Sequence, residues 1–284
     1  MNRINPFQKY YDLINNKTKR PTFPYLIDIE LTNKCNLSCS FCRRNDMERE
    51  QGMMSDDTFE FIVHEVENKD CSLRFIRWGE PTLHKNIVEY VKYATLKNID
   101  THLTTNGTAP MGVYKNLIDA GLCSIIFSFQ GATENQHELM RGGLDTGYLS
   151  EVVHYVETYR ADCNIPFIQV SSTMTDADSQ DDIDVFKQSW GDIADAVVIG
   201  RTMDYEEVKD GEPCYDPNYK LAIDWNGDIT ACCADYDSLL TIGNISEMSI
   251  LDAWNSDIIK KWRAVLGKGL RSKLHPCDEC KKAY

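Results

Sequence analysis

Short runs of apolar residues recur along the first 200 residues and alternate with longer segments in which apolar residues repeat at helical spacing. The runs are rich in β-branched and aromatic residues, and several end in Gly or in a Ser/Thr pair, as strands do. We therefore predict six strands. They cover residues 25–32, 72–79, 99–107, 124–131, 166–173 and 194–200.

The segments between these runs predict helices. Within residues 55–69 four apolar residues fall on one helical face, and Ser55 stands where an N-cap is expected. Gly121 is placed to end another helix. The predicted helices cover residues 55–69, 86–98, 112–121, 148–160 and 181–190.

Six alternating strand–helix units indicate a parallel sheet with right-handed crossovers. A closed barrel of this kind needs eight units, so we predict an α/β fold in the form of an open, partial (β/α)6 TIM-like barrel, with active residues at the carboxyl ends of its strands. We expect residues 1–205 to form this barrel. Residues 206–284 are expected to form a small Cys-bearing domain, with a β-hairpin at 225–228 and a helix over 249–269.

The charge of the chain excludes some partners. With 30 Lys and Arg against 44 Asp and Glu, the formal net charge is −14, and the basic residues form no stripe. Such a chain is not expected to bind nucleic acids or anionic membranes broadly. No run is long enough for a transmembrane helix, and residues 1–17 lack the apolar core of a signal peptide, so we expect a cytoplasmic protein.

Cysteine is the residue type that points to chemistry. Eleven cysteines in a chain expected in a reducing compartment favour metal or cluster ligation over disulfides. Seven of them fall in two groups, and Cys233 stands beside the second group. The groups are Cys35, Cys39 and Cys42, and Cys214, Cys232, Cys277 and Cys280. Three cysteines stand alone, and each is expected to be a small apolar side chain. They are Cys71, Cys123 and Cys163.

The first group is spaced C-x3-C-x2-C, directly after the first predicted strand, and it offers three thiols where a structural zinc site needs four ligands. A [4Fe–4S] cluster held by three thiolates keeps one iron open to another molecule. The spacing allows one loop to surround such a cluster, and Arg43 and Arg44 can offset its negative charge. The alternative at this point is a zinc ion with a distant fourth ligand.

Cys35, Cys39 and Cys42, with the aromatic Phe41 before the last cysteine, resemble the signature of the radical S-adenosylmethionine (SAM) superfamily. The resemblance implies that the open iron binds the amino and carboxylate groups of SAM and that an electron from the cluster cleaves the sulfonium. The resulting 5′-deoxyadenosyl radical would then take a hydrogen atom from the substrate. The resemblance also implies an external electron donor such as flavodoxin or ferredoxin.

Three further motifs resemble the same superfamily. "RWGEP" (77–81) is similar to its Gly-Gly-Glu-Pro motif, with Trp78 in place of the first Gly. "TTNGT" (104–108) matches a common strand-end motif near the ribose of SAM. "SFQGATENQHELMRGG" (128–143) is similar to the Ser-x-Asp-Gly…Arg-Gly stretch, with Gln130 where Asp is frequent, so a carboxylate base is not expected there.

The resemblance assigns roles in SAM binding to residues of these motifs. Glu80 would accept from the ammonium of SAM, and Arg141 would bind its carboxylate by a charge-assisted fork. Gly79 would let the backbone come close. The residues assigned to SAM are Phe41, Gly79, Glu80, Asn106, Ser128 and Arg141.

The second cysteine group reads C-x12-G-x4-C followed by C-x2-C and resembles the C-terminal extension that carries auxiliary iron–sulfur clusters in part of this superfamily. The full extension, the SPASM domain, has seven cysteines and two clusters. The resemblance here implies the shortened twitch form, with one auxiliary [4Fe–4S] cluster on Cys214, Cys232, Cys277 and Cys280, and thus two clusters in the chain. Cys232 is preferred to Cys233 because it completes G-x4-C and because strand neighbours point to opposite faces. A four-Cys zinc site has the same ligand count.

A radical enzyme acting on a small or medium-sized substrate is the leading interpretation. Four protein ligands would close the auxiliary cluster to substrate and leave it to accept the second electron of an oxidation. Relatives with such domains oxidise alcohols, epimerise sugars or aminocyclitols, or modify ribosomally made peptides. Only about 24 residues precede the first predicted strand, with no evident domain for a leader peptide, which favours a carbohydrate-like substrate. We therefore expect oxidation of a C–H bond next to a hydroxyl or amine.

Other interpretations stay open. An epimerase would need a thiol as hydrogen donor, for which Cys233 is the candidate, and a peptide remains an alternative substrate. The polar strand-end residues Gln130, Gln169 and Arg201 are candidate substrate contacts. A two-site electron carrier or zinc scaffold is the non-enzyme alternative, but it needs neither an open iron nor a barrel mouth.

Overall fold

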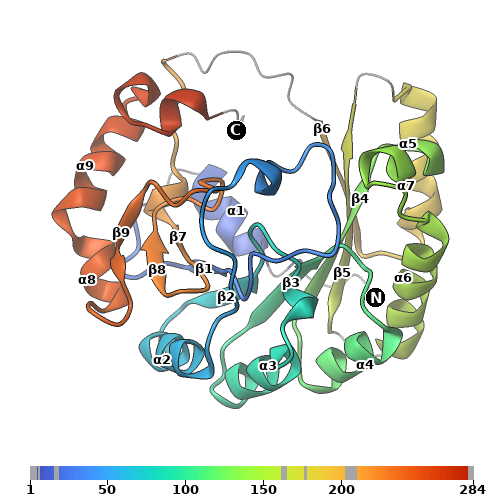
Figure 1. Ribbon diagram of the computed structural model, residues 1–284, viewed down its shortest axis with the longest axis horizontal. Helices are drawn as coiled ribbons and strands as arrows, with labels where there is room; N and C mark the ends of the chain where they lie inside the picture. Colours follow the sequence, from blue (N-terminus) through green and yellow to red (C-terminus); the bar gives the residue numbers. More distant parts are fainter. Residues whose placement is uncertain are drawn as a thin grey trace.

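The described part of the chain forms a single curved sheet with helices along its outer side (Figure 1). The computed structural model describes residues 5, 7–15, 19–160, 165–175, 178–201 and 210–280. Within these residues the strand order is β6-β5-β4-β3-β2-β1-β7-β8-β9. The strands are β1 (Leu26–Ile29), β2 (Ser72–Phe75), β3 (Thr101–Thr105), β4 (Ser124–Gln130), β5 (Phe167–Met174), β6 (Ala196–Arg201), β7 (Lys220–Ile223), β8 (Asp228–Thr230) and β9 (Thr241–Asn244).

Strands β1 to β6 are parallel and follow the order of the chain, which confirms the predicted α/β fold with a six-stranded parallel sheet. The C-terminal hairpin continues this sheet. Strand β7 lies parallel to β1, with Leu26 opposite Lys220 and Ile29 opposite Ile223. Strands β8 and β9 then add antiparallel, and the predicted turn at 225–228 joins β7 to β8 with Gly227 at φ +89°. The carboxyl ends of β1 to β7 therefore meet at one edge.

Five predicted helices are present, with ends shifted by a few residues. The second helix illustrates the local reasons: Ser55 caps it by accepting a hydrogen bond from Thr58 N, and its four predicted apolar residues are all buried. The Gly121 expected to end a helix has φ +97° and follows the C-cap Ala120. The helices confirmed are α2 (Asp56–Val66), α3 (Ile87–Leu96), α4 (Met111–Asp119), α6 (Thr146–Arg160) and α7 (Gln180–Gly191).

The structure departs from the predicted helices in two ways. The single helix expected over 249–269 is two helices, α8 (Ile250–Asn255) and α9 (Asp257–Leu266), because Ser256 between them is extended at φ −63°, ψ 156°. Helices α1 (Gln8–Asn15) and α5 (Glu134–Met140) were not expected. The domain boundary predicted at residue 205 falls within 202–209, which lie outside the described residues.

The two faces of the sheet differ in polarity, because successive side chains of a strand point to opposite faces. One face packs against the helices through apolar residues such as Ile27, Leu103 and Phe127. The other face is mostly polar. It carries Asp28, Glu30, Arg74, Thr104, Ser128, Gln130, Gln169, Ser171 and Thr173. A polar concave face suits a site that receives a hydrophilic molecule.

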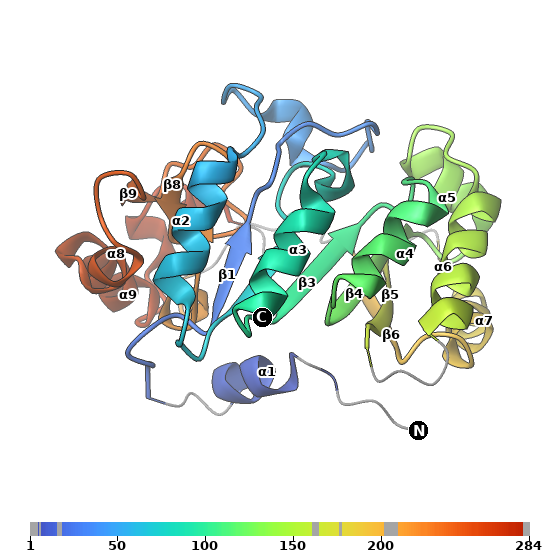
Figure 2. The same ribbon diagram turned by 90° about the horizontal axis from the view of Figure 1, so that it is seen from below.

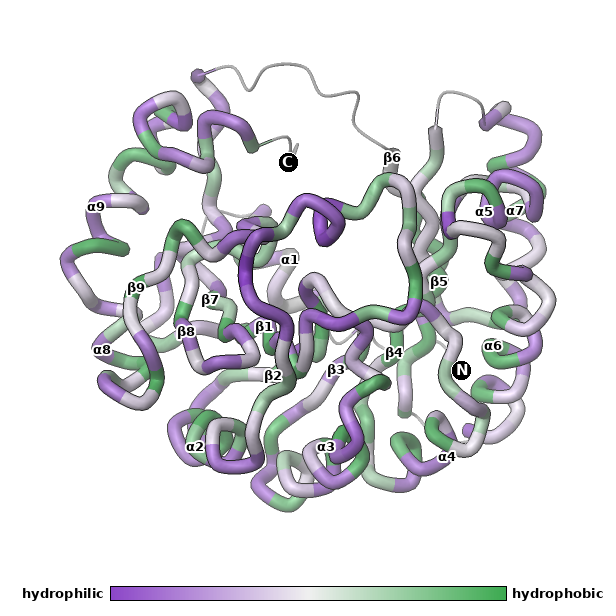
Figure 3. The backbone as a smooth tube through the Cα atoms, in the orientation of Figure 1, coloured by the Kyte–Doolittle hydropathy of each residue, from purple (hydrophilic) through white to green (hydrophobic). Residues whose placement is uncertain are grey.

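Helix α1 lies across the amino ends of the strands, at the opposite end from the loop that follows β1 (Figure 2). Phe7, Tyr10, Leu26 and Tyr219 form a small buried cluster there. The loop that follows β1 crosses the middle of the view in Figure 3, and its segment after Cys42 is strongly hydrophilic. No helix in the described part of the chain has the length and apolar character needed to cross a lipid bilayer.

Candidate active site

The three cysteines of the first group lie on the loop between β1 and a short 3-10 helix (Arg43–Asp46). Leu37 N donates to Cys35 Sγ at 3.4 Å, and Cys42 N donates to Cys39 O at 3.1 Å. Burial raises the pKa of the Cys35 and Cys39 thiols, and the neighbouring Cys42 thiol adds to the increase in both. The three thiols therefore lie on one loop, within range of one another's charge.

Residues at the end of α5 and just past the end of β3 hold this loop. Ser40 N donates to Met140 O at 3.0 Å, at the end of α5. Asn106 Nδ2, just past β3, donates to Asn36 Oδ1 at 3.0 Å and lies 3.9 Å from Cys35 Sγ. The predicted ribose-side residue Asn106 is thus beside the first cysteine of the loop.

Glu80, just past β2, is buried and ties two strand ends together. Its Oε1 accepts from Thr82 N at 3.0 Å and from Thr105 Oγ1 at 2.8 Å, and its Oε2 accepts from Asn106 N at 2.7 Å. Burial raises the pKa of Glu80, although these hydrogen bonds oppose the increase. A carboxylate oxygen has two lone pairs, so Oε2 can accept one further donor.

The glycine of the same motif serves a contact within the chain. A Cβ at Gly79 would lie 2.0 Å from Thr32 O and 2.8 Å from Lys34 O. The next residue, Glu80, donates its backbone N–H to Lys34 O at 2.9 Å. Gly79 is therefore needed so that the strand end can pack against the segment that leads into the cysteine loop.

Arg141 is the C-cap residue of α5. Its side chain donates to Ser128 O through Nη2, and its Nε is buried without a hydrogen-bond partner among the described residues. Burial lowers the pKa of Arg141, and the Cys39 and Glu80 side chains oppose the decrease. Gln130, at the end of β4, has its Oε1 buried and unpaired within the same residues.

These groups fit the cofactors that the sequence predicts. Three thiols on one loop leave the fourth position of a cluster open, the free lone pair of Glu80 suits an ammonium, and the unpaired Nε of Arg141 suits a carboxylate. In the described part of the chain, no three His, Cys, Asp or Glu converge as ligands of one metal ion do. A cubane spaces its thiolates more widely, because each binds a different iron.

The remaining predicted residues lie around this site. Phe41 is partly buried on the cysteine loop, next to Cys42. Gln169 lies in β5 and faces the polar side of the sheet, where its Nε2 donates to Ser171 Oγ at 2.8 Å. Arg201 ends β6, and its side chain lies outside what the structure describes.

Of the C-terminal cysteines, Cys277 begins a short 3-10 helix (Cys277–Glu279) and Cys280 follows it, with Cys280 N donating to Cys277 O at 3.3 Å. Burial raises the pKa of Cys277 to about 12, and the neighbouring Cys280 and Cys214 add to the increase. Cys214 N is bound to Leu266 O at the end of α9. Cys232 follows β8, and its Sγ accepts from Ala234 N at 3.4 Å.

Cys233 lies with Cys232 past the end of β8, in a turn and not in a strand, so the strand alternation that we expected for this pair does not apply. Its Sγ accepts from Lys220 Nζ at 3.3 Å, and Lys220 also pairs with Asp216 at 2.8 Å. Of the isolated cysteines, Cys71 is buried and Cys123 partly buried. Cys163 lies outside the described residues.

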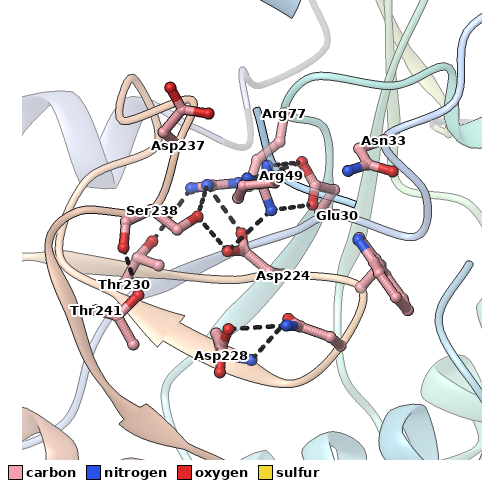
Figure 4. Close-up of polar contacts among 12 residues, drawn as sticks. Glu30, Asn33, Arg49, Arg77, Asp224, Asp228, Thr230, Asp237, Ser238 and Thr241 are labelled. Carbon is pink, nitrogen blue, oxygen red and sulfur yellow. Dashed lines mark hydrogen bonds and ion pairs between the residues drawn. The ribbon is translucent and has the colours of Figure 1, made fainter. Parts of the chain in front are cut away.

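A network of four charged side chains lies where the ends of β1, β2 and β7 meet and was not predicted (Figure 4). Three of the side chains are fully buried, and that of Arg49 is 14% exposed. Arg49 binds both oxygens of Glu30 at 2.9 and 3.0 Å and Asp224 at 3.1 Å, while Arg77 binds Asp224 at 2.8 Å. Burial raises the pKa of Asp224 to about 6, and Arg77 opposes this. The signal available in the sequence is the alternation of acidic and apolar residues in "LIDIE", which places Glu30 on the inner face.

Two sequence models of known families match the chain. The model of the radical SAM superfamily matches residues 29–161, and the model of an iron–sulfur cluster-binding domain, SPASM, matches residues 214–281. The first match contains the three-cysteine loop, Glu80 and Arg141. The second contains the four C-terminal cysteines.

Curated relatives include a dehydrogenase, a probable nucleotide cyclase and peptide cyclases. The S-adenosyl-L-methionine-dependent 2-deoxy-scyllo-inosamine dehydrogenase of Niallia circulans is 22% identical over 264 residues, which cover 90% of this chain and 92% of the dehydrogenase. The probable GTP 3′,8-cyclase of Pyrococcus horikoshii is 30% identical over 114 residues, 40% of this chain. The chain spans only 37% of the length of that cyclase.

Solved structures share the fold over nearly the whole chain. BtrN in complex with AdoMet and 2-DOIA has a TM-score of 0.65 at 19% identity, covering 94% of this chain and 95% of BtrN. SuiB of Streptococcus suis bound to its precursor peptide SuiA has a TM-score of 0.71 at 15% identity, covering 99% of this chain and 81% of SuiB. At these identities the likeness concerns the fold, an open parallel sheet followed by a C-terminal hairpin region.

Proposed function

Since the chain belongs to the radical SAM superfamily and carries a C-terminal SPASM iron–sulfur cluster-binding domain, we propose that it is a SAM-cleaving oxidoreductase. The proposed substrate is a sugar- or cyclitol-like molecule, oxidised at a C–H bond next to a hydroxyl or amine. Residues 1–205 would form the catalytic barrel and residues 206–284 the auxiliary domain. An external donor such as flavodoxin or ferredoxin would supply the electron that starts the reaction.

Two [4Fe–4S] clusters would serve this reaction. The first would bind to Cys35, Cys39 and Cys42, and the second to Cys214, Cys232, Cys277 and Cys280. When bound, the first cluster and SAM would supply the radical chemistry that abstracts hydrogen, and the second cluster would supply an acceptor for the electron that oxidation releases.

The residues of the chain would bind and orient SAM at the carboxyl ends of the strands. Glu80 would accept from the ammonium through the remaining lone pair of Oε2, and Arg141 would donate through its unpaired Nε to the carboxylate. Asn106 and Ser128 would approach the nucleoside part. Because Glu80 and Arg141 are held by hydrogen bonds to neighbouring strand ends, their side chains are oriented before SAM binds.

The observation that carries the choice of substrate is the polar inner face of the sheet. In the half formed by β3 to β5 this face offers neutral hydroxyl and amide groups, including Thr104, Gln130 and Gln169. The Thr104 Oγ1 and Gln130 Oε1 atoms are buried and unpaired within the described residues. Neutral donors and acceptors match the hydroxyls of a polyol. The likeness to the dehydrogenase and to BtrN, each over at least nine-tenths of both chains, gives the same support.

Epimerisation is the second candidate, and one observation favours it. Cys233 is partly exposed, and its sulfur accepts a hydrogen bond from Lys220. Lys220 also lies 3.8 Å from Asp28, which belongs to the polar face of the sheet. A thiol there would serve as the hydrogen donor that an epimerase needs.

An anaerobic reaction in D2O separates the two. Reconstituted protein with dithionite and SAM is incubated with a panel of aminocyclitols, sugars and short peptides, and the products are analysed by mass spectrometry. Oxidation gives a product lighter by two hydrogens without solvent deuterium at the reacting carbon, and Cys233→Ala keeps turnover. One deuterium at an inverted carbon, lost in Cys233→Ala, would instead establish the epimerase. Turnover of peptides alone would refute the proposed substrate class.

A further inference from the structure

Arg77 follows β2 directly and has a backbone conformation unusual for its residue type. Its φ is +106°, a region that side chains other than glycine rarely adopt. Such conformations persist where the surrounding contacts hold them, and they gather at functional sites. The contacts of Arg77 therefore indicate what the conformation serves.

The guanidinium of Arg77 is fully buried and donates to one segment of the C-terminal region (Figure 4). Its Nη1 donates to Cys232 O at 3.0 Å and to Thr230 Oγ1 at 3.2 Å. Its Nη2 donates to Asp235 O at 3.0 Å and lies 3.4 Å from Ser238 Oγ. One side chain thus binds both ends of the turn that carries Cys232.

Buried charges fix the guanidinium in this position. Asp224, just past β7, lies 2.8 Å from Nη2, and Glu30, just past β1, lies 3.8 Å from Nε. Arg49 binds both carboxylates from the other side and also donates to Tyr236 O at 2.7 Å. Two carboxylates and two guanidinium groups balance in charge, so none of the four is left as an isolated buried ion.

The position of Arg77 in the sequence connects the two cysteine groups. Gly79 and Glu80 follow it at the carboxyl edge of the sheet, where Gly79 packs against the segment leading to Cys35. Its own side chain reaches Cys232. A displacement of Arg77 would therefore move both the segment that leads to Cys35 and the turn that carries Cys232.

Only arginine suits this set of partners. Its planar fork presents five donors in fixed directions, so it can bind two carbonyls and a carboxylate at once. A lysine has one nitrogen at the end of a flexible chain and cannot bind Cys232 O and Asp235 O while it pairs with Asp224. A test with lysine therefore keeps the charge and removes the geometry.

We propose that Arg77 is a positioning residue for the auxiliary cluster: it holds the turn that carries Cys232 in its ligating shape through hydrogen bonds to Cys232 O and Asp235 O. The inference rests on the proposed role of Cys232 as a ligand. Arg77 also neutralises the buried Asp224 carboxylate beside this turn, and net charge and hydrogen bonding are among the factors that set the potential of such clusters. Without Arg77 the surroundings of the cluster would be more negative, which disfavours the form that has gained an electron. Arg77 would thus make the auxiliary cluster a better electron acceptor.

The test isolates the C-terminal site. In a Cys35→Ala, Cys39→Ala, Cys42→Ala background only the auxiliary site can hold a cluster. The iron content, spectrum and potential that are measured then belong to that cluster alone, and SAM is not cleaved. Arg77→Lys and Arg77→Met are made in this background and reconstituted anaerobically. Arg160→Met is the matched control, because Arg160 is a buried arginine paired with Asp195 at the far edge of the sheet.

Three quantities are measured: bound iron, the electron paramagnetic resonance spectrum of the reduced cluster, and its midpoint potential. We expect Arg77→Lys to lose iron to a chelator about tenfold faster than the parent and to have an altered spectrum. Tenfold is the lower end of the roughly 10- to 100-fold effect of removing a hydrogen-bond partner of a metal ligand. Arg77→Met is expected to lose iron faster still and to have a more negative potential in the cluster that remains. Arg160→Met is expected to match the parent in all three.

Iron release, spectra and potentials equal to the parent in both Arg77 variants would overturn the inference. If Arg77→Met does not fold, as judged by circular dichroism, Arg77→Lys alone decides by the same criteria. If the site binds zinc instead of iron, the proposed function loses its electron acceptor, but the rate of zinc release still tests the positioning role. Unchanged zinc release in Arg77→Lys would then refute it.

Discussion

Replacing Glu80 with Gln tests the candidate SAM site with the smallest change in shape. The carboxylate accepts from Thr82 N, Thr105 Oγ1 and Asn106 N, and it is buried. An amide has only one oxygen. If that oxygen keeps the bonds to Thr82 and Thr105, the new NH2 faces Asn106 N–H, and a buried donor is left unpaired at a cost of about 1–3 kcal/mol.

The same change removes the charge that is proposed to bind the ammonium of SAM. A hydrogen bond to a charged group contributes about 1.5–3 kcal/mol, which corresponds to a roughly 10- to 150-fold change in Kd. We therefore expect Glu80→Gln to bind SAM at least about tenfold more weakly and to be less stable by about 1–3 kcal/mol.

Equilibrium dialysis of SAM against reconstituted protein measures the first effect, and urea unfolding of the same samples measures the second. Glu67→Gln is the control, because Glu67 is a partly exposed carboxylate that pairs with Lys97 at 3.2 Å, away from the site. Its expected change in stability is below about 1 kcal/mol, with SAM binding unaltered. An E80Q protein that binds SAM as tightly as the parent would refute the assignment of Glu80, whatever its stability.

Three further predictions concern the clusters, the core and the second SAM contact. Reconstituted protein is expected to hold about eight irons per chain, falling to about four when Cys277 and Cys280 are replaced with Ala; equimolar zinc with only about four irons in the parent would favour a zinc site instead. Burial, assisted by Arg74, lowers the pKa of His102 to about 3, so the folded state excludes a proton that the unfolded state binds below about pH 6.5. The folded state is therefore destabilised as pH falls below about 6.5, by at most about 1.4 kcal/mol per pH unit. Between pH 7.5 and pH 5.5, the free energy of unfolding in urea should fall less in His102→Asn than in the parent, and an equal fall in both proteins would contradict this prediction. Arg141→Lys is expected to weaken SAM binding about tenfold or more, because one ammonium cannot bind both Ser128 O and a carboxylate, and an unchanged Kd would exclude Arg141 from the site.

The fold followed from the sequence where the periodicity was strong. The spacing of Phe59, Ile62, Val63 and Val66 predicted α2 and its buried face, and the six apolar runs predicted the order of a parallel sheet. The C-x3-C-x2-C motif could be predicted to place its thiols on one loop because it is short and local. These are signals contained within one segment of the chain.

Features that depend on distant segments were not predictable in this way. The parallel pairing of β7 with β1 joins residues nearly 200 positions apart, and nothing in the sequence around Lys220 specifies that neighbour. The break at Ser256 was missed because no Gly or Pro marks it within residues 249–266, although Ser256 is both the C-cap of α8 and the N-cap of α9. The sequence motif "RWGEP" contains Arg77 but does not indicate its partners. Arg77 binds Cys232 O and Asp224 only because the fold places the ends of β2 and β7 beside the turn at Cys232. Tertiary contacts decide such cases.

The central claim is that this chain cleaves SAM by radical chemistry at the three-cysteine loop. The most direct measurement is the release of 5′-deoxyadenosine, followed by chromatography and mass spectrometry, from anaerobically reconstituted protein with dithionite and SAM. The parent protein is expected to release it, and the Cys35→Ala, Cys39→Ala, Cys42→Ala protein is expected to release none while still holding about four irons at its C-terminal cysteines. Equal release by the two proteins, or none from a parent that carries its full iron, would contradict the claim.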